Sequence, residues 1–491
     1  MGSSCCKVDV SSYFTTIDTP EDQAFGKYDF PFENLVMEGG GVKGIAYIGA
    51  LRVLESAGIL KNIKRVAGSS SGAVIATLVA LGLNCEQMAE IMMIDMRKIL
   101  FSGGLFERLI KPCMFFRRLG WDTGNGFYKY CGNILKRFTG NPDITFKELY
   151  DMTGKELCIV VTNLDQQTEE YCHVKTTPYL PIRNALRMSM SLPVLFQPVV
   201  EDYFGDKTHY VDGGAACNYP LHCFDGWWLS MEEQNSFFNK LVDLTILRRA
   251  LHRSERFEPM NPKTVGILLY SDEDIELFWD RLTEEEKKHE MSRKYKDKRK
   301  METIDAMINR KKMQSFVDIF LTDLKNKDSN SDSQIDRQEM HSVFDEACAD
   351  KLCGDYWKYS VDQLFDQMDT DRDGQITYLE VHEFFGNKGF HWLTGPVGNR
   401  QEEGTSSRLN LLDYAAKYLD LFHAHTKKIY HKADDMNRTI GVDSDYVKTT
   451  DFKLKYRDKI FLFKRGASGA RGFLRTYITN ENLHPRRGRP R

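Results

Sequence analysis

Two glycine-rich turns near the start of the chain constrain its fold most strongly, because each joins a buried strand to a helix. Residues 34–38 are a short apolar run that predicts a buried strand, and helical spacing follows from Gly44 to Gly58. A second strand is predicted at residues 63–67, and the turn Gly68–Gly72 leads into another apolar helix. This order, with short loops, predicts an α/β fold in which helices cover a mainly parallel central sheet.

The rest of the chain continues this pattern and then changes in character. Further buried strands are predicted at residues 157–162, 199–203 and 264–270. Residues 284–312 are dense in charge and predict a solvated helical connector. With 491 residues, and about 150 residues per domain as a guide, the chain has room for roughly three units.

The composition excludes several classes of protein. The 67 basic and 70 acidic residues give a net charge of −3, which excludes a basic nucleic-acid coat and an acidic disordered chain. The longest apolar run, residues 74–83, is about half of what spans a bilayer, so we expect no membrane-spanning segment. No apolar signal peptide opens the chain, and the 11 cysteines are scattered, which favours a reducing, cytoplasmic location.

The predicted leader, residues 1–30, carries a pattern typical of lipid attachment. Gly2 follows the first methionine, as in N-myristoylated proteins, and the adjacent Cys5 and Cys6 are candidates for palmitoylation. Cys6 stands where the myristoylation motif has serine or threonine, so an unacylated, disordered leader is the alternative. Two acyl chains would anchor the protein stably, which predicts peripheral association with a membrane surface.

Ser70 is the candidate nucleophile. It is the centre of the G-x-S-x-G sequence Gly68–Gly72, which lies between a predicted strand and a predicted helix, as a nucleophile elbow requires. The elbow is a strained turn, so the positions two before and two after the nucleophile must lack side chains. Ser69 and Ser71 are inferior candidates because neither has glycine at both positions. Taken alone, the pentapeptide could also be a plain turn.

The glycine run Gly39–Gly44 supports a hydrolytic site. It also follows a strand and opens a helix, where exposed backbone N–H groups can hold an anion. A tetrahedral oxyanion needs such donors, each worth about 3–4 kcal/mol. The same glycines satisfy a dinucleotide-binding motif, but the second strand ends in Ala67 and lacks the acidic residue that this motif requires. A phosphate-binding loop needs Gly-Lys-Ser/Thr, which the sequence around Lys43 does not match.

Asp212 is the candidate base that would accept the serine proton. It ends a predicted strand, and two glycines follow it and allow close approach of the backbone. An Asp-Gly turn without a catalytic role is the alternative. Of the 12 histidines, His173, His209 and His222 lie near core elements but lack a recognisable catalytic context, and His209 stays open as a base.

The three motifs, in this order, resemble the patatin-like phospholipase family over about residues 30–275. The resemblance implies a three-layer αβα sandwich and a Ser70–Asp212 dyad without histidine. It also implies an oxyanion hole formed by Gly39, Gly40, Gly41 and Val42. Other positions that match the family are Ala185, Arg187, Ser189, Ser191, Pro193, Phe196 and Pro198.

The activity implied by the resemblance is hydrolysis of carboxylic ester bonds in membrane phospholipids. Asp212 would accept the Ser70 proton during attack on the carbonyl, and water would then release the acyl group. An aspartate of ordinary pKa near 4 is a poor base, so geometry and oxyanion stabilisation are expected to carry more of the rate than in a histidine triad. Residues 98–121, rich in aromatic and basic side chains, predict either a membrane-facing lid or the lining of the core and acyl pocket.

Two acidic loops of twelve residues predict an all-α EF-hand pair within residues 313–390. In both, oxygen-bearing residues fall at loop positions 1, 3, 5, 9 and 12, with a backbone carbonyl at position 7. The first set is Asp328, Asn330, Asp332, Gln334, Asp336 and Glu339, and the second is Asp369, Asp371, Asp373, Gln375, Thr377 and Glu380. Ca²⁺ is expected at both sites, but the first has Ser333 where glycine permits the sharp turn, which lowers its expected affinity.

The remaining segments complete the predicted organisation. Residues 31–283 form the catalytic domain, and residues 391–478 resemble the closing helices and strand of patatin domains, so the calcium module is expected to be inserted within that domain. Residues 479–491 predict a basic, disordered tail, and a single short basic sequence there is too little to predict nucleic-acid binding. The hypothesis is a lipid acyl hydrolase regulated by Ca²⁺. The alternative is a catalytically silent, calcium-dependent lipid-binding protein.

Overall fold

The computed structural model describes most of residues 14–287 and three later stretches. The described residues are 14–15, 17–94, 97, 99, 119–203, 206–241, 247–270, 278, 281–287, 334–343, 360–387 and 433–486. The predicted lipidation sites Gly2, Cys5 and Cys6 lie outside the described residues, as do most of the predicted lid and most of the charged connector.

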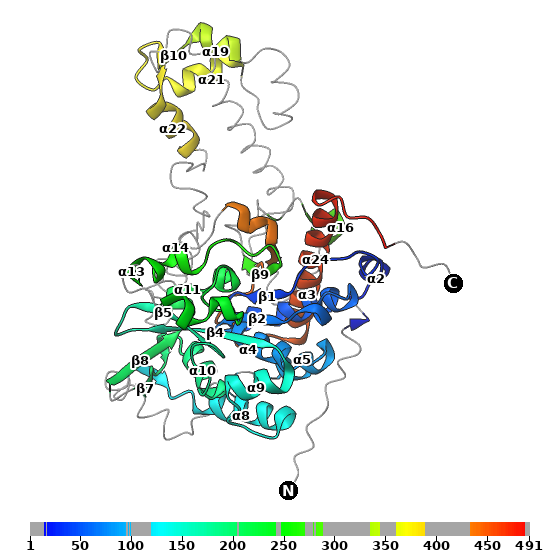
Figure 1. Cartoon of the computed structure of the whole chain (residues 1–491). Helices are drawn as coiled ribbons and strands as arrows, with labels where there is room; N and C mark the ends of the chain where they lie inside the picture. Colours follow the sequence, from blue (N-terminus) through cyan, green and yellow to red (C-terminus); the bar gives the residue numbers. More distant parts are fainter. Residues whose placement is uncertain are drawn as a thin grey trace. The chain divides into compact units, whose positions relative to one another are not determined.

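The chain divides into two compact units (Figure 1). The first unit comprises residues 1–271, 277–292 and 407–491, and the second comprises residues 272–276 and 293–406. In sequence, the second unit therefore interrupts the first.

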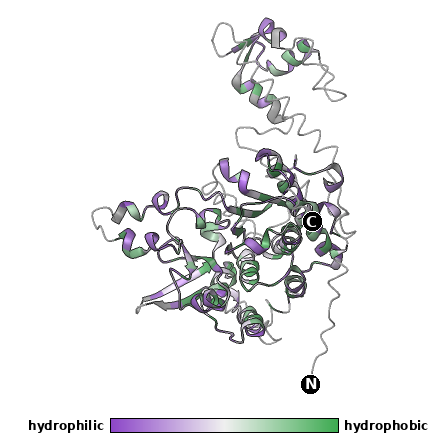
Figure 2. Cartoon of the chain, turned by 45° about the vertical axis from the view of Figure 1, so that its right-hand side comes forward, coloured by the Kyte–Doolittle hydropathy of each residue, from purple (hydrophilic) through white to green (hydrophobic). Residues whose placement is uncertain are grey.

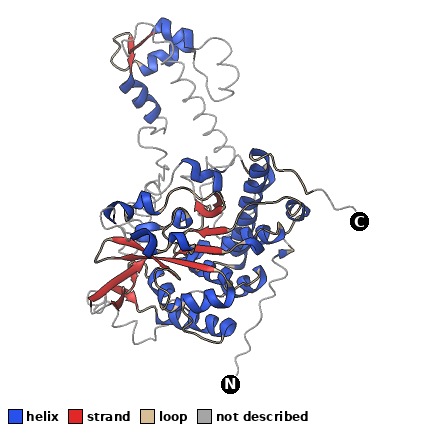
Figure 3. Cartoon of the chain, in the orientation of Figure 1, coloured by secondary structure: helices blue, strands red, loops and turns tan. Residues whose placement is uncertain are grey.

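An eight-stranded sheet forms the centre of the first unit (Figure 3). In spatial order its main path is β12 (Thr439–Asp443), β9 (Thr264–Tyr270), β1 (Asn34–Met37), β2 (Arg65–Ser69), β4 (Glu156–Asn163), β8 (Asp206–Asp212) and β7 (Val199–Tyr203), and β5 (Thr168–His173) also pairs with β4. From β12 to β4 all neighbours are parallel, whereas β5, β8 and β7 join by antiparallel pairing. The sheet is mixed and mostly parallel, which confirms the predicted α/β class.

The parallel strands are buried on both faces, and this explains their continuous apolar sequences. Every residue of β1, β9 and β12 is buried. Parallel strands covered by helices on both sides have no solvent face, so their side chains need not alternate between apolar and polar. Hydrophobic residues accordingly gather on the inner strands and on the helices beside them (Figure 2).

Two helices from opposite ends of the chain pack together beside this sheet, namely α3 (Ala46–Ser56) and α24 (Tyr456–Asn480). Glycines allow their close approach. A Cβ on Gly49 would lie 1.9 Å from the Phe463 carbonyl oxygen, and one on Gly466 would lie 1.9 Å from the Ala46 carbonyl oxygen. The first unit is therefore completed by residues that follow the second unit in sequence.

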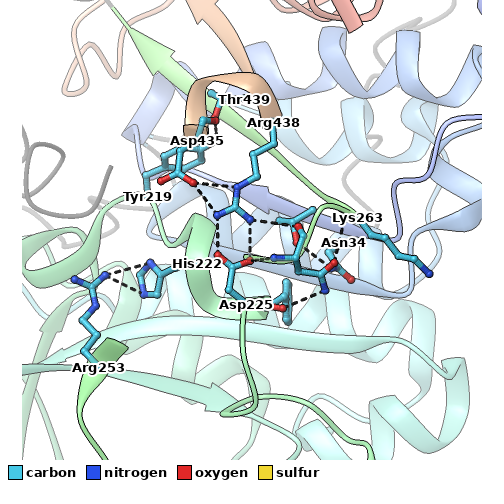
Figure 4. Close-up of polar contacts among 12 residues, drawn as sticks. Asn34, Tyr219, His222, Asp225, Arg253, Lys263, Asp435, Arg438 and Thr439 are labelled. Atoms are coloured by element: carbon cyan, nitrogen blue, oxygen red, sulfur yellow. Dashed lines mark hydrogen bonds and ion pairs between the residues drawn. The ribbon is translucent and has the colours of Figure 1, made fainter. Parts of the chain in front are cut away.

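A buried ion-pair cluster links Asp435 and Arg438, which follow the second unit in sequence, to Asp225 of the first unit (Figure 4). The Arg438 guanidinium donates to Asp225 Oδ2 and to Asp435 Oδ1, each at 2.7 Å, and all three side chains are at most 8% exposed. Asp225 Oδ1 also accepts from the Asn261 amide at 2.9 Å. Buried charges of opposite sign with these added hydrogen bonds resist separation, because either charge left alone would be buried without a partner.

The boundaries of several elements differ from the sequence prediction. The segment after the first glycine run begins as a 3₁₀ turn, η1 (Gly41–Ile45), so the helix proper starts at Ala46. The chain continues as α24 to Asn480, and Arg486 hydrogen-bonds to Asp29, so order extends into the stretch predicted as a disordered tail.

The remaining α-helices of this unit among the described residues are α2 (Pro20–Phe25), α4 (Ser71–Ala80), α5 (Cys85–Met92), α8 (Asn125–Thr139), α9 (Phe146–Thr153), α10 (Ile182–Ser189), α11 (Gly214–Cys217), α12 (Phe237–Leu241), α13 (Leu247–Ala250), α14 (Arg253–Arg256) and α16 (Glu284–Lys287). A small parallel pair, β3 (Gly120–Asp122) with β6 (Val194–Phe196), lies outside the main sheet.

The described part of the second unit is a pair of short strands with flanking helices. Strands β10 (Gln334–Asp336) and β11 (Gln375–Thr377) pair antiparallel, with Ile335 opposite Ile376. The helices are α19 (Arg337–Val343), α21 (Val361–Met368) and α22 (Tyr378–Asn387). Both isoleucines are buried, together with side chains from all three helices, so the described residues have an apolar core of their own.

Within the described residues, no helix combines the length and the apolar character needed to cross a membrane.

Candidate active site

Ser70 lies between the end of β2 and the start of α4, where a strand turns sharply into a helix. Its backbone has φ 51° and ψ −124°, a conformation that side-chain-bearing residues rarely adopt. Such a conformation costs about 1–3 kcal/mol and persists only where the surrounding structure imposes it. The turn presents the Ser70 side chain at the N-terminus of α4, where the helix dipole favours negative charge.

The two flanking glycines are required by close backbone contacts. A Cβ on Gly68 would lie 2.3 Å from the carbonyl carbon of Gly72. A Cβ on Gly72 would lie 2.5 Å from the carbonyl oxygens of both Met37 and Glu38 at the end of β1. The glycines of the predicted elbow thus allow the turn to close on itself and to pack against the neighbouring strand.

Asp212 ends β8 and faces the serine. The Ser70 hydroxyl donates to Asp212 Oδ2 at 2.8 Å, and the Gly214 amide donates to Asp212 Oδ1 at 2.8 Å. A Cβ on Gly213 would lie 2.2 Å from the Val160 carbonyl oxygen, so the glycine after Asp212 lets this turn pack against β4. The structure therefore brings the two predicted catalytic side chains together within hydrogen-bond distance.

Burial changes the proton affinity of Asp212. Ser70 is 5% exposed and Asp212 is 1% exposed. Desolvation raises the pKa of Asp212 to about 7, although the hydrogen bonds from Ser70 and from the Gly214 amide act in the opposite direction. The expectation of an ordinary aspartate with a pKa near 4 is therefore wrong. A carboxylate with a pKa near 7 is a much better match for a general base at neutral pH.

Three of the four predicted oxyanion-hole amides already have acceptors within the protein. The Gly39 N–H donates to the Asn218 carbonyl oxygen at 2.9 Å, and the Val42 N–H donates to the Thr449 carbonyl oxygen at 3.2 Å. The Gly40 N–H donates to Ser71 Oγ at 3.0 Å.

The fourth amide, that of Gly41, has no acceptor among the described residues. Gly41 has φ 55°, and a Cβ there would lie 2.3 Å from the Thr449 carbonyl oxygen, so only glycine fits this position. Of the four predicted donors, Gly41 therefore has the N–H that is available to an oxyanion without the loss of an existing bond.

A buried glutamate, which the sequence did not point to, holds the glycine loop in place. Glu38 is 1% exposed, and its two carboxylate oxygens accept from the Leu269 amide at 2.7 Å and from Asn218 Nδ2 at 3.1 Å. Asn218 Nδ2 also donates to the Gly39 carbonyl oxygen at 3.0 Å. The sequence Asn218-Tyr219-Pro220, which begins four residues after the Asp-Gly-Gly motif ends, was the only available signal for this link.

The three histidines considered as alternative bases make other contacts. His209 Nδ1 lies 3.1 Å from Asp165 Oδ2 in a half-exposed pair. His173 Nε2 lies 3.3 Å from Glu156 Oε2, and His222 Nε2 lies 2.7 Å from the Tyr171 hydroxyl. These partners belong neither to the elbow nor to the Asp212 turn, whereas Asp212 contacts Ser70 directly.

Met190 packs beside the serine, and its Sδ atom is 3.5 Å from Ser70 Oγ. Met190 also lies close to Gly124, Phe127, Arg187 and Phe196, and the space among these residues is too small for a water molecule.

In the second unit, the loop that begins at Asp369 has the geometry of a cation site. Carboxylate oxygens of Asp369, Asp371 and Asp373 all lie within 4.8 Å of one another. Asp369 Oδ1 is buried and has no hydrogen-bond donor among the described residues. Gly374 has φ 83° at loop position 6, where the sharp turn needs glycine. These residues fit a hard cation with oxygen ligands.

The other predicted ligands of the two loops are only partly described. Glu380, at position 12, accepts from the Thr370 amide at 2.8 Å and from the Thr377 amide at 2.9 Å, so it closes the second loop. In the first loop, Asp336 Oδ1 accepts from the Glu339 amide at 2.8 Å. Gln334 pairs with Thr377 and Gln375 pairs with Asp336 across the two strands, on either side of the paired isoleucines. Asp328, Asn330 and Asp332 lie outside the described residues.

An α/β sheet that carries a serine on a strand–helix elbow, beside a buried carboxylate and a glycine-rich loop, is typical of serine hydrolases. Residues 35–225 match the model of the family described as patatin-like phospholipase. Residues 35–225 are therefore similar to this family, and the serine elbow, the buried carboxylate and the glycine-rich loop all lie within that stretch.

Curated relatives match part of the chain. The chain is 32% identical over 200 residues to the uncharacterized protein R571 of Acanthamoeba polyphaga mimivirus, with 39% of this chain and 61% of that protein covered. It is 29% identical over 230 residues to the uncharacterized protein YqhO of Bacillus subtilis, with 45% of this chain and 73% of that protein covered. It is 25% identical over 202 residues to the probable lipid hydrolase 463L of invertebrate iridescent virus 6, with 39% of this chain and 62% of that protein covered.

Proposed function

We propose that this protein is a lipid acyl hydrolase that cleaves carboxylic ester bonds of membrane phospholipids through a Ser70–Asp212 dyad. The hydrogen bond of 2.8 Å from the Ser70 hydroxyl to the buried Asp212 carboxylate carries this proposal. The match to the patatin-like phospholipase family and the similarity to a probable lipid hydrolase support the substrate class.

In the proposed reaction, Asp212 accepts the Ser70 proton while Ser70 Oγ attacks the ester carbonyl carbon. The carbonyl oxygen becomes an oxyanion, which accepts from the Gly41 amide. Collapse of the tetrahedral intermediate breaks the ester bond, and the proton on Asp212 passes to the alcohol that leaves. Water then attacks the acyl-serine with Asp212 again as base, and this step releases the fatty acid and restores the serine.

The pH dependence of serine reactivity tests this proposal. Because only the deprotonated carboxylate can accept the proton, we expect labelling by a fluorophosphonate probe to rise with pH around a midpoint of about 7. Below the midpoint the rate should fall about tenfold per pH unit, since the fraction of ionised Asp212 falls by that factor. The measurement is the rate of covalent labelling of the full chain between pH 5 and 9.

The same measurement defines the opposing result. A midpoint near 4 would mean that Asp212 titrates as an ordinary, solvated aspartate and is not the buried base. No labelling at any pH would remove the hydrolase proposal and leave the alternative of a calcium-dependent lipid-binding protein.

We further propose that Ca²⁺ binds both loops of the second unit and regulates hydrolysis. The clustered carboxylates of Asp369, Asp371 and Asp373 and the unpaired Asp369 Oδ1 support the second site. The pairing of Ile335 with Ile376, each at position 8 of its loop, supports a paired arrangement of the two loops. Ca²⁺ binding opens the helices of sensor EF-hands and exposes an apolar surface, which would favour contact with lipid.

Calcium titration with loop variants tests this regulation. We expect full-length protein to bind two Ca²⁺ in calorimetry, with the second loop in the sensor range of about 10⁻⁷ to 10⁻⁵ M. Glu380→Gln should weaken only the second site, by about 100-fold, because position 12 supplies a bidentate carboxylate. Glu339→Gln is the matched control and should weaken only the first site. Hydrolysis of anionic phospholipid vesicles should be faster with Ca²⁺ than with chelator, and equal rates would exclude regulation.

A further inference from the structure

The short segment Ser189–Ser191, at the C-terminal end of α10, contacts both members of the dyad. The Ser70 amide donates to Ser189 Oγ at 2.9 Å, and Met190 Sδ lies 3.5 Å from Ser70 Oγ. The Asp212 amide donates to the Ser191 carbonyl oxygen at 3.0 Å. One tripeptide therefore holds the backbones of two residues that are far apart in sequence.

The hydrogen-bonding role of the Ser189 hydroxyl is unambiguous. It must donate to the Val160 carbonyl oxygen, at 2.7 Å, because a carbonyl cannot donate. It must accept from the Ser70 amide, because a backbone N–H cannot accept. Ser189 is fully buried, so no water can replace either bond without entering the core. The hydroxyl thus connects β4 directly to the nucleophile.

The bond to Ser189 has two consequences for the nucleophile. It ties down the amide of a residue whose φ of 51° is unfavourable, and such a conformation needs support from its surroundings. It also occupies the Ser70 N–H, so this amide is not available to an oxyanion. The position of Ser70 Oγ relative to Asp212 Oδ2 therefore depends on the hydrogen bond from the Ser70 amide to Ser189 Oγ, although this bond involves neither the Ser70 nor the Asp212 side chain.

A buried arginine anchors the same segment. Arg187, 7% exposed, donates to the carbonyl oxygens of Thr123 at 2.7 Å and Gln197 at 2.9 Å, and also to Ser191 Oγ. Its position in the last turn of α10 suits a positive charge at a helix C-terminus. The segment that holds the dyad is therefore itself fixed on both sides, which makes it a rigid support.

We infer that Ser189 is a positioning residue for the nucleophile: its hydroxyl holds the Ser70 amide and thereby sets the Ser70–Asp212 hydrogen bond. This inference rests on the proposed function, because it concerns the reactivity of Ser70. Ser189 touches neither the ester nor the proton that is transferred. Its effect should therefore appear in the rate of serine attack and not in substrate binding.

Two substitutions separate hydrogen bonding from packing. Ser189→Ala removes the acceptor, and Ser189→Cys keeps nearly the same volume but offers only a weak acceptor. We expect both to reduce kcat on a soluble ester and the rate of fluorophosphonate labelling by about 10- to 100-fold, with Ala at least as severe as Cys. KM should stay within about twofold, and the pH midpoint should rise, because the Ser70 hydrogen bond that both substitutions weaken lowers the pKa of Asp212.

The matched control is Ser468→Ala. Ser468 is another buried serine, 1% exposed, whose hydroxyl has no hydrogen-bond partner among the described residues and which lies in α24. It should keep full activity, and thermal unfolding of all variants would report any loss of folded protein. If Ser189→Ala does not fold, the cysteine variant alone carries the test.

The outcomes are distinct. Folded Ser189 variants that react like the parent would overturn the positioning role and leave the proposed hydrolase function intact. A parent protein that does not react with the probe would overturn both. Loss of activity in Ser189→Ala with full activity in Ser189→Cys would mean that volume, and not the hydrogen bond, is what Ser189 supplies.

Discussion

Ser70→Ala should abolish ester hydrolysis, with a fall in kcat on the order of 10⁴-fold or more. In the proposed reaction the Ser70 oxygen attacks the ester, and removal of the nucleophile from a serine hydrolase leaves only the contributions of binding and the oxyanion hole. Covalent labelling by a fluorophosphonate should disappear together with hydrolysis. The measurement is release of fatty acid from phospholipid vesicles, compared with the parent at equal protein concentration.

Ser468→Ala serves as the control here too, since it removes a buried hydroxyl from the same unit without touching the elbow. A folded Ser70→Ala protein that still hydrolyses the vesicles would show that another group is the nucleophile. In that case the hydrogen bond of 2.8 Å from the Ser70 hydroxyl to Asp212 would stabilise the fold and would have no part in catalysis.

Asp212→Asn should inactivate the protein and also stabilise it at alkaline pH. Asparagine cannot accept the serine proton, so we expect kcat to fall by about 10³-fold or more. The pKa of Asp212 is raised to about 7 by burial, so the folded protein keeps a proton that the unfolded chain loses near pH 4. The stability of the parent therefore declines as pH rises from about 4 to about 7, and this cost remains above pH 7.

The difference between the two proteins should follow this titration. Near pH 4 the free energies of unfolding should be similar, and by pH 8 the variant should be more stable by up to about 4 kcal/mol, the cost of three pKa units. Urea unfolding at several pH values measures it. A constant difference across pH would contradict a buried, ionising Asp212.

Asp225→Asn should lower the free energy of unfolding, which is opposite to the effect expected for Asp212→Asn at alkaline pH. Asp225 is also buried, but its carboxylate is paired with Arg438 at 2.7 Å. Loss of that charge leaves a buried guanidinium with Asp435 as its one carboxylate partner among the described residues, so we expect destabilisation of about 3 kcal/mol or more. Burial raises the pKa of both aspartates, but only Asp225 is paired with a buried cation, and this pairing is why the two substitutions should have opposite effects.

The local parts of the site were accessible from sequence because contiguous residues encode them. The elbow needs glycine two positions before and two positions after Ser70, and the turn after Asp212 needs glycine at position 213, so these motifs stand out in the printed chain. The order of strands and helices was accessible for the same reason, since buried parallel strands have continuous apolar sequences. That the two motifs form one site came from the resemblance to a family and not from spacing.

The sequence could not reveal which backbone amides are free. The amides of Gly39 and Val42 are occupied by carbonyl oxygens of Asn218 and Thr449, which come from distant parts of the chain. It could not reveal the pKa of Asp212 either, because that value depends on burial, which tertiary packing creates. The role of Ser189 was hidden for the same reason, since its two partners belong to other elements.

The position of the second unit in the chain has a consequence for synthesis. Strand β9 ends at Tyr270 and its neighbour β12 begins only at Thr439. The ribosome therefore synthesises the whole second unit before β12, the partner of β9, emerges. Until then β9 is an exposed sheet edge, the kind of surface that invites aggregation, and Val42 lacks the Thr449 carbonyl that orders its loop. The nascent chain therefore cannot complete the contacts of its first glycine-rich loop until residues that follow the second unit have been made.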